Sequence, residues 1–379
     1  MQTVISSSRD DCYQVHVTRR EAALVAQWNA WAHQADVTPF QTRRWLETWY
    51  ATTGRAAGQP LLMTVVDHNG GDLVMMMPLV IRTETRMRKI EFADAGLSHY
   101  NAPALGPAAP TDRLGAQHLW SAMLAAMPKA DFLRFERMPR EVQGRVNPLT
   151  LLPNAEESAT NSNIVIIDGS WIDYTKSLER TFRKELGRSW RVFCQRDGAA
   201  FRRIEDRSEG ATVLAELERQ QRDRVHRKGQ LYHLDKPEYA AFYRKLIADG
   251  ISDGSVVLTA LTCRDEIVAA LLGVAHGATY VMIRICSGSE EWSNCSPGRL
   301  VITQTMQMLH AQGYRMFDFS IGDYAYKRRL GVSSHPLFRL STAMSPRGLP
   351  MLAIERTKKF IKQRPALYAL VKHYAPKNA

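Results

Sequence analysis

The sequence lacks paired cysteines, long apolar runs and a secretory leader. Its five cysteines form no Cys-x-x-Cys pair in 379 residues, which argues for a reducing compartment and against a zinc site. No run of about 18 apolar residues is present, so we expect no membrane-spanning helix. The first six residues lack the basic-then-apolar pattern of a secretory signal. We therefore expect a cytoplasmic protein.

Acidic residues are also in deficit. The chain carries 50 Lys and Arg against 38 Asp and Glu, a formal net charge of +12. This balance favours polyanionic partners, such as nucleotide phosphates, RNA or an acidic membrane surface, without choosing among them. A hydrophobic share of 45% and a charged share of 23% are typical of a soluble globular protein. The length is enough for two domains with cores of their own.

The most informative stretch is segment 317–331, FDFSIGDYAYKRRLG. Phe317 and Phe319 alternate with polar residues, which predicts a half-buried strand that ends at Gly322. Asp323 is a suitable N-cap for a short helix after it, and Gly331 a suitable C-cap. A strand end that brings an acid, two tyrosines and three cations to one place can bind an anionic ligand. A solvated basic helix turn is the alternative.

A second anion site is predicted where segment 294–300, NCSPGRL, begins a helix. Ser296 is expected at the N-cap and Pro297 at the first helical position. Gly298 leaves room for a ligand against the backbone, and Arg299 adds positive charge to the free N–H groups of the helix start. An ordinary capped helix is the alternative. The strand expected just before it ends in Ser287 and Gly288, which allow close backbone approach.

The two halves of the chain repeat one pattern. In each, two apolar runs joined by a turn precede a helix and then a strand; the first turn contains Asn69-Gly70, a strong hairpin signal. The repeat predicts two copies of one fold, and chance recurrence of α/β elements is the alternative. We expect an N-terminal domain over residues 1–160, a C-terminal domain over 161–350 and a basic C-terminal helix over 351–379. Residues 158–162 are expected to be a polar linker.

The segment Gly322 to Gly331 resembles the Gly-Asp-x-x-Tyr-Lys-Arg-Arg-x-Gly signature of the CelD/BcsL family, GNAT-type acyltransferases associated with cellulose and exopolysaccharide synthesis. The resemblance extends to segments 36–46 and 296–300. It implies an α+β architecture of two GNAT-type folds in tandem, with mixed sheets and flanking helices. It also implies acyl-CoA, such as acetyl-CoA, as co-substrate, a small-molecule or saccharide acceptor, and no metal.

The resemblance also implies roles for single residues. Asp323 is the first candidate for the base and His226 the second, while Tyr326 or the adjacent Tyr324 would protonate the leaving thiolate. Lys327 and Arg328 would bind phosphate or steady the oxyanion. The remaining expected cofactor contacts come from the strand end and helix start described above: Ser287, Gly288, Ser296, Gly298 and Arg299. Asp318 is expected to face the cleft.

The sequence departs from the family pattern at three positions of this segment. Tyr324 stands where glutamate is frequent, Ala325 where proline is frequent and Leu330 where tryptophan is frequent. If that glutamate is the usual base, another residue must replace it here.

Two other functions stay open. One is a FemABX-like aminoacyl transferase that uses charged tRNA, although the long heptad segment of a tRNA-binding arm is missing. The other is a non-catalytic GNAT-like binding module. Nucleic acid is expected as a partner only in the first of these. The basic C-terminal segment suggests peripheral contact with an anionic inner-membrane surface or a synthase complex.

Overall fold

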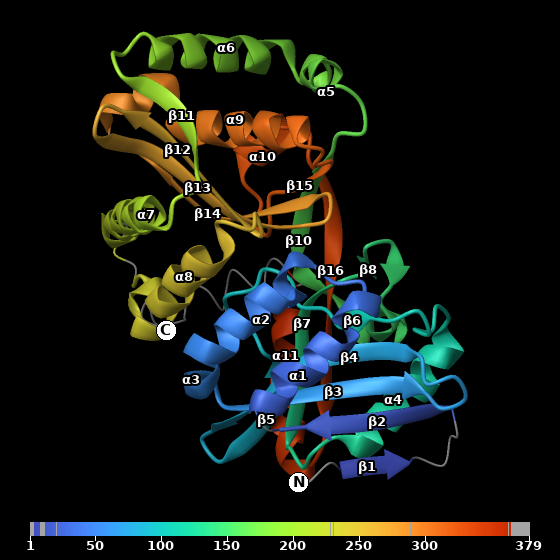
Figure 1. Ribbon diagram of the computed structural model, residues 1–379. Helices are drawn as coiled ribbons and strands as arrows, with labels where there is room; N and C mark the ends of the chain where they lie inside the picture. The colour runs from blue at the N-terminus through green and yellow to red at the C-terminus, as the bar shows by residue number, and fades with distance from the viewer. Residues whose placement is uncertain are drawn as a thin grey trace.

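The computed structural model describes residues 4–7, 12–19, 21–227, 229, 231–288, 290–362 and 364. Its framework is one long mixed sheet that runs through both halves of the chain (Figure 1). The strand order is β1-β2-β3-β4-β5-β7-β16-β10-β15-β14-β13-β12-β11, with β6 paired to β4. Within the described residues, no helix is long and apolar enough to cross a membrane.

The N-terminal half contributes one end of this sheet. Its strands are β1 (Val4–Ser7), β2 (Tyr13–Thr18), β3 (Gln59–Asp67), β4 (Leu73–Glu84), β5 (Met87–Phe92), β6 (Ala104–Leu105) and β7 (Phe132–Pro139). Side chains alternate along β3, so that Leu61 packs under α4 (Arg113–Ala126) and Leu62 faces α1 (Glu21–Trp31) and α2 (Arg43–Trp49). The predicted β3–β4 hairpin is confirmed, with the Gly70 N–H donating to Asp67 Oδ2 at 2.8 Å.

The C-terminal half repeats this arrangement. Its strands are β11 (Ala199–Ile204), β12 (Val256–Cys263), β13 (Glu266–His276), β14 (Thr279–Ser287) and β15 (Met316–Asp318). One face is covered by α6 (Arg180–Cys194) and α9 (Pro297–Ala311), and the other by α7 (Arg207–Arg227) and α8 (Pro237–Gly250). In both halves the fifth strand lies parallel to the fourth, β7 beside β5 and β15 beside β14.

Smaller elements complete the chain. They are α3 (Arg55–Ala57), α5 (Trp171–Ser177), α10 (Ala325–Arg329), α11 (Leu349–Lys362), the ribbon β8 (Glu141–Val142) and β9 (Arg145–Val146), and short 3₁₀ or π turns at 32–34, 39–41, 50–54, 148–151, 233–235, 290–295 and 346–348. The predicted basic C-terminal helix is described as α11 only up to Lys362. The rest of the predicted helix, which includes the apolar Leu367, Leu370 and Val371, lies outside the described residues.

The two halves exchange a strand. β10 (Ala155–Ile166), which follows the first half in the chain, pairs antiparallel with β15 of the second half. β16 (Ser333–Ala343), which follows the second half, pairs antiparallel with β7 of the first. The two exchanged strands also pair with each other and form the long ribbon that joins the halves in Figure 1.

This exchange corrects the predicted linker. Residues 158–162 belong to β10, and the expected boundary between residues 160 and 161 falls inside that strand. The segment is polar because it lies in the ribbon between the two halves, where Glu157, Ala159 and Asn161 are exposed. The polar composition of residues 158–162 therefore reflects their exposed position in the ribbon. It does not indicate a lack of regular structure.

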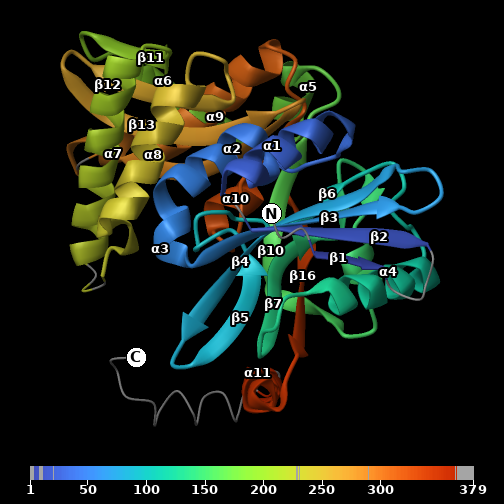
Figure 2. The same ribbon diagram turned by 60° about the horizontal axis from the view of Figure 1, so that its bottom comes forward.

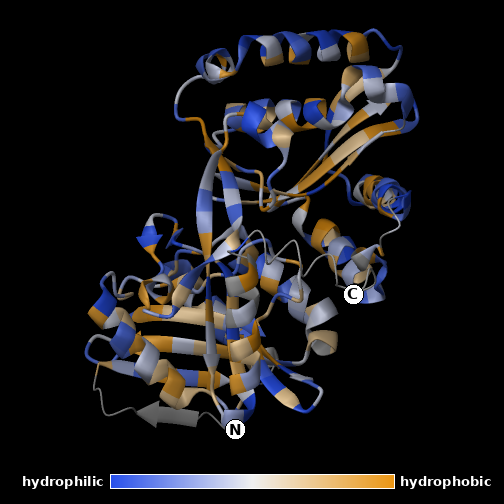
Figure 3. Cartoon of the chain, turned by 180° about the vertical axis from the view of Figure 1, so that it is seen from behind, coloured by the Kyte–Doolittle hydropathy of each residue, from blue (hydrophilic) through white to orange (hydrophobic). Residues whose placement is uncertain are grey.

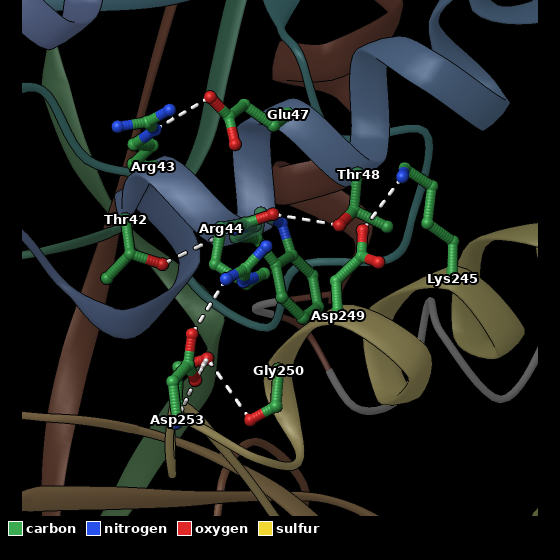
Figure 4. Close-up of polar contacts among 11 residues, drawn as sticks. Thr42, Arg43, Arg44, Glu47, Thr48, Lys245, Asp249, Gly250 and Asp253 are labelled. Carbon is green, nitrogen blue, oxygen red and sulfur yellow. Dashed lines mark hydrogen bonds and ion pairs between the residues drawn. The ribbon is translucent and has the colours of Figure 1, made fainter. Parts of the chain in front are cut away.

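Helices α2 and α8 connect the halves along one side of the sheet (Figure 2). The Trp45 and Phe242 rings meet edge to face with centroids 4.8 Å apart, inside an apolar cluster that both halves share. Figure 4 shows the polar margin of this contact, where Arg44 Nη2 donates to Asp253 Oδ2 at 2.7 Å. The halves thus share a core as well as a sheet.

Candidate active site

Strands β14 and β15 separate after a short parallel pairing. Only Thr279–Val281 pair with Met316–Asp318, and β14 then continues to Ser287 without β15 beside it. On its other edge β14 carries a bulge, because Met282 pairs with Gly273 but Arg284 already pairs with Leu272. Ile283 is therefore an extra residue that re-aims the strand. The opening leads to Ser287, at the strand end where the sequence predicted close backbone approach.

Helix α9 begins beside the end of β14. A Cβ added at Gly298 would lie 3.2 Å from the Ser287 Cβ, so any larger residue would fill the space between helix start and strand end. Ser296 occupies the predicted N-cap position, with φ +50°, but its side chain makes no capping hydrogen bond. Pro297 follows at the first helical position, as predicted. The positive end of the helix dipole is thus left without a capping side chain.

A cavity of about 270 Å³ opens next to this strand end. Ser287 and Gly288 form one wall, and Arg224 and Arg227 of α7 stand on another. Four carboxylates also border it, from Glu216, Asp223, Glu266 and Glu290. The cavity offers backbone and guanidinium donors that an anionic ligand requires.

The α9 start and the basic turn after β15 meet at one carboxylate. Glu185 of α6 accepts from Arg299 Nη1 at 3.1 Å and from Arg329 Nη1 at 2.8 Å. The hydrogen bonds from Arg329 keep the pKa of this exposed carboxyl below its ordinary value. The two cationic features predicted from the sequence therefore lie together.

Lys327 does not point into an open phosphate site. Its side chain is buried, with 2% of its surface exposed, and its ammonium donates to the carbonyls of Ser320, Ile321 and Gly322 at 3.1, 2.8 and 2.9 Å. These bonds use all three N–H donors of the ammonium. Burial lowers the Lys327 pKa to about 8. The predicted phosphate role does not match this position, because the cation is committed to the loop.

The same loop corrects two further predictions. Strand β15 ends at Asp318 and not at Gly322, because Ser320 adopts φ +65° and turns the chain. Helix α10 starts after Tyr324, so Asp323 is not its N-cap. Gly331, with φ +73°, follows the helix as its predicted C-terminal glycine.

Two pairs of side chains from opposite halves meet behind this loop. The Tyr100 hydroxyl donates to Asp318 Oδ1 at 2.6 Å, and His99 Nδ1 contacts Ser320 Oγ. Burial raises the Asp318 pKa to about 6 and lowers the His99 pKa to about 3. Sequence analysis placed Asp318 at the cleft but gave no role to His99 or Tyr100, because the Tyr100–Asp318 bond spans 218 residues and no local pattern records it.

A larger cavity, of about 500 Å³, lies between the halves on this side of the sheet. Its polar lining includes Tyr100, Asp318, Ser162 and His335. Its apolar lining includes Pro39, Ile164, Ile166, Val281, Met316 and Pro336. Because Val281 and Asp318 are the last register pair of β14 and β15, the cavity reaches the point where these strands separate.

Tyr326 is the first of the two tyrosines predicted to act as the acid. It is partly buried, packs against the core under α9 and stacks on Tyr324 with ring centroids 6.0 Å apart. Burial raises the Tyr326 pKa to about 12, an effect that the charge of Arg224 on α7 opposes. Arg224, which lines the cavity beside Ser287, is therefore within electrostatic reach of Tyr326. Tyr324 itself is 58% exposed.

Three other predicted residues lie at the surface. The side chains of Asp323 and Arg328 are 79% and 69% exposed, and their closest polar atoms are 3.8 Å apart. His226 is half exposed near the end of α7, with Nε2 3.8 Å from Asp235 Oδ2, and it is not among the residues that line the cavity beside Ser287. In the described part of the chain, no group of three or more His, Cys, Asp or Glu side chains is placed to hold a metal ion.

Comparisons with known proteins agree with this geometry. Residues 180–328, which run from α6 to α10, match the family model described as an acetyltransferase (GNAT) domain. No curated protein sequence matches the chain. The predicted fold class, an α+β tandem GNAT-type architecture, is confirmed, whereas nothing in the comparisons identifies the CelD/BcsL family itself.

Three solved structures resemble nearly the whole chain. FemX is 14% identical over 87% of this chain and 98% of its own, with a TM-score of 0.58. The C-terminal domain of a putative lysylphosphatidylglycerol synthetase from Agrobacterium fabrum is 12% identical over 89% and 96%, with a TM-score of 0.50. A conserved protein of unknown function from Bacteroides thetaiotaomicron is 12% identical over 87% and 99%, with a TM-score of 0.51. At these identities the likeness shows the fold alone.

Proposed function

We propose that this chain is an acyltransferase that moves an acyl group, acetyl as the first candidate, from acyl-CoA to an amine or hydroxyl acceptor. The observation that carries the proposal is the opening between β14 and β15, bulged at Ile283 and bordered by the uncapped start of α9. The match of residues 180–328 to a GNAT acetyltransferase domain supports it.

In this proposal the thioester lies along the free edge of β14. Backbone N–H groups beyond Val281 polarise its carbonyl and stabilise the tetrahedral oxyanion. The start of α9 at Gly298 and the cavity lined by Arg224 and Arg227, both of which adjoin Ser287, hold the phosphates of CoA. Lys327 contributes indirectly, because it fixes the loop that carries Ser320 to Gly322.

Asp318, and not Asp323, is the base that we propose. Its pKa of about 6 leaves it largely ionised at neutral pH yet basic enough to take a proton. The acceptor O–H or N–H gives its proton to Asp318 as its oxygen or nitrogen bonds to the acyl carbon. The C–S bond then breaks, and the CoA thiolate takes a proton from Tyr326. Because the phenol pKa is about 12, Tyr326 begins as a hydrogen-bond donor to the sulfur.

The acceptor occupies the cavity of about 500 Å³ between the halves. Asp318 and Tyr100 lie in its wall, so an acceptor hydroxyl there approaches the carboxylate directly. The resemblance to the exopolysaccharide-associated family favours a saccharide acceptor, and with it a cytoplasmic protein that works beside the inner membrane.

A second function has one observation in its favour. The fold likeness to FemX supports an aminoacyl transferase of the FemABX kind, with charged tRNA as donor. In that case the cationic cavity beside Ser287 would receive the 3′ end of the tRNA instead of CoA.

Isothermal titration with acetyl-CoA tests the proposal. Wild-type protein is expected to bind with micromolar affinity, and Gly298→Val to lose at least tenfold, because the new side chain would occupy the space against Ser287. Gly187→Val, where nothing lies within 4 Å of the added Cβ, is the matched control. Binding of charged tRNA without acetyl-CoA would favour the FemX-like function. Binding of neither would leave a non-catalytic module.

A further inference from the structure

Helix α6 presents a line of cations on its outer face. Arg180, Lys184, Arg188 and Arg191 follow one another at intervals of four, four and three residues, the spacing of a single helix face. All four are exposed, and the buried Phe182 and Phe193 lie on the opposite face. We call these four residues the α6 cation row.

The row is uncompensated by acid. Among the residues that the structure describes, none of its four members forms an ion pair. The single carboxylate within the helix, Glu185, lies on another flank and already serves Arg299 and Arg329. Glu179, which precedes the helix, accepts a hydrogen bond from Thr181. Four like charges on one face are costly unless an anionic partner or salt screens them.

Apolar and aromatic side chains border the row. Ile172 on the neighbouring α5 is 62% exposed. A groove of about 250 Å³ runs between α5, α6 and α9, lined by Trp171, Leu186 and Trp190 among others. Aromatic and aliphatic side chains beside cations are typical of surfaces that rest at a lipid headgroup layer. A nucleic-acid phosphate backbone makes no use of an exposed isoleucine.

The position of α6 suits a flat partner. It lies at the outer end of the molecule with α5 beside it. It covers the face of the C-terminal strands that points away from the N-terminal half (Figure 1). The view from behind shows the same helix at the edge of the molecule (Figure 3). No other described element projects beyond it in either view.

We propose that the α5–α6 face is a docking surface for an anionic lipid bilayer. The α6 cation row contacts the phosphate headgroups, and Ile172 enters the headgroup layer beside it. The proposal concerns attachment of the protein to a membrane and is independent of the transferase chemistry.

Vesicle co-sedimentation tests the proposal on the full chain. We expect binding to phosphatidylglycerol vesicles in 0.1 M salt and no binding to phosphatidylcholine vesicles. Replacing the four members of the row by Gln should weaken the partition by on the order of 600-fold, because each of the four cations near an anionic surface contributes about fivefold. The control replaces the exposed Arg43, Arg113, Lys129 and Arg244 by Gln, which removes equal charge elsewhere. Both variants retain residues 351–379, so the difference reports α6.

A second pair of variants tests the apolar contribution. Ile172→Asn should weaken the partition roughly threefold to tenfold, and Leu114→Asn on α4, which is also 62% exposed, should leave it unchanged. Equal binding of the two four-residue variants would overturn the proposal. So would binding of tRNA through the row without any binding to phosphatidylglycerol vesicles, since the surface would then be a nucleic-acid site.

Discussion

The two halves share a strand order but differ where a ligand would bind. In the C-terminal half the fourth strand is bulged and α9 starts without a side-chain cap. In the N-terminal half β4 and β5 pair without any register shift, and Asp112 caps α4 by accepting from the Gly115 N–H at 2.9 Å. That carboxylate occupies the place where an anion would approach the helix. One copy of the fold therefore leaves its helix start without a capping side chain, and the other caps the equivalent start with its own acid.

The fifth strands differ in the same way. Asp318, the third residue of β15, is buried and faces the cavity between the halves. At the equivalent position, Arg134, the third residue of β7, forms an ion pair with Glu91 of β5, with Nη2 2.6 Å from Oε1. The comparison supports placing the proposed catalysis in the second half, while the first supplies Tyr100 and part of the cavity wall.

The largest expected effect follows from Asp318→Asn. Release of CoA thiol from acetyl-CoA, with water as the acceptor, should fall at least 100-fold at pH 8 because the base is lost. The wild-type rate should decline as pH falls through about 6, where Asp318 takes up a proton, and the variant should lose this dependence. Asp323→Asn, at an exposed position, should change the rate less than twofold. The reverse order of effects would restore Asp323 as the base.

A carboxylate at the start of α9 would make the C-terminal half resemble the N-terminal one. Ser296→Asp should weaken acetyl-CoA binding about tenfold to 100-fold, because it places a negative charge at the helix start. Ser296→Asn is the neutral control and also tolerates a positive φ. Unchanged binding in titration calorimetry for Ser296→Asp would mean that the anion site lies elsewhere.

The buried His99 makes the contact between halves sensitive to acid. Its folded pKa of about 3 lies below the ordinary value of 6.5, so the unfolded chain binds the proton first. Stability from this group is complete above about pH 6.5 and is lost as pH falls. At pH 5 the loss is about 2 kcal/mol.

Urea unfolding at pH 7 and pH 5 measures this loss. His99→Gln should lose about 2 kcal/mol less than wild type between the two pH values, whereas the exposed His118→Gln should behave as wild type. Asp318 opposes the trend, because its raised pKa makes the folded state bind more protons between about pH 4 and 6. Identical losses in all three proteins would show that His99 is accessible to protons in the folded state.

The smallest effect is expected at the polar margin between the halves. Arg44→Gln removes the ion pair with Asp253. The Arg44 side chain is 32% exposed and the Asp253 side chain 46% exposed. Partly exposed ion pairs contribute about 0.5 kcal/mol, so thermal unfolding should shift by only a few degrees. A loss above about 2 kcal/mol would mean that this margin, and not the shared core, holds the halves together.

Local signals predicted much of the fold. The turn at Asn69-Gly70, the start of α9 at Ser296-Pro297 and the repeated order of elements are all recorded in neighbouring residues, and the structure confirms them. The strand exchange is not recorded locally, since β10 and β16 are separated by more than 150 residues. Their polar stretches resemble linkers because many residues of the ribbon, such as 157, 159 and 161 of β10 and 333–336 of β16, are exposed to solvent.

In the candidate site, too, some features are predicted by neighbouring residues and others depend on long-range contacts. Its backbone features, a strand opening and a helix start, follow from turn and cap chemistry. The direction of each side chain does not. In Tyr326-Lys327-Arg328-Arg329 every residue is polar, so no periodicity shows that Lys327 turns inward while Arg328 faces water. The positions of His99 and Tyr100 in the site depend on contacts with residues more than 200 positions away in the sequence.

The reciprocal pairing of β10 and β16 makes the two copies of the fold inseparable. A gene fragment encoding residues 1–160 would leave β7 with an open edge, and one encoding the remainder would leave β16 without β7 and without the first half of β10. Unsatisfied edges of this kind recruit strands from other molecules. Two intact chains could satisfy each other in the same manner by trading these strands, so a crossover that ties one molecule together is also a ready route to an intertwined dimer.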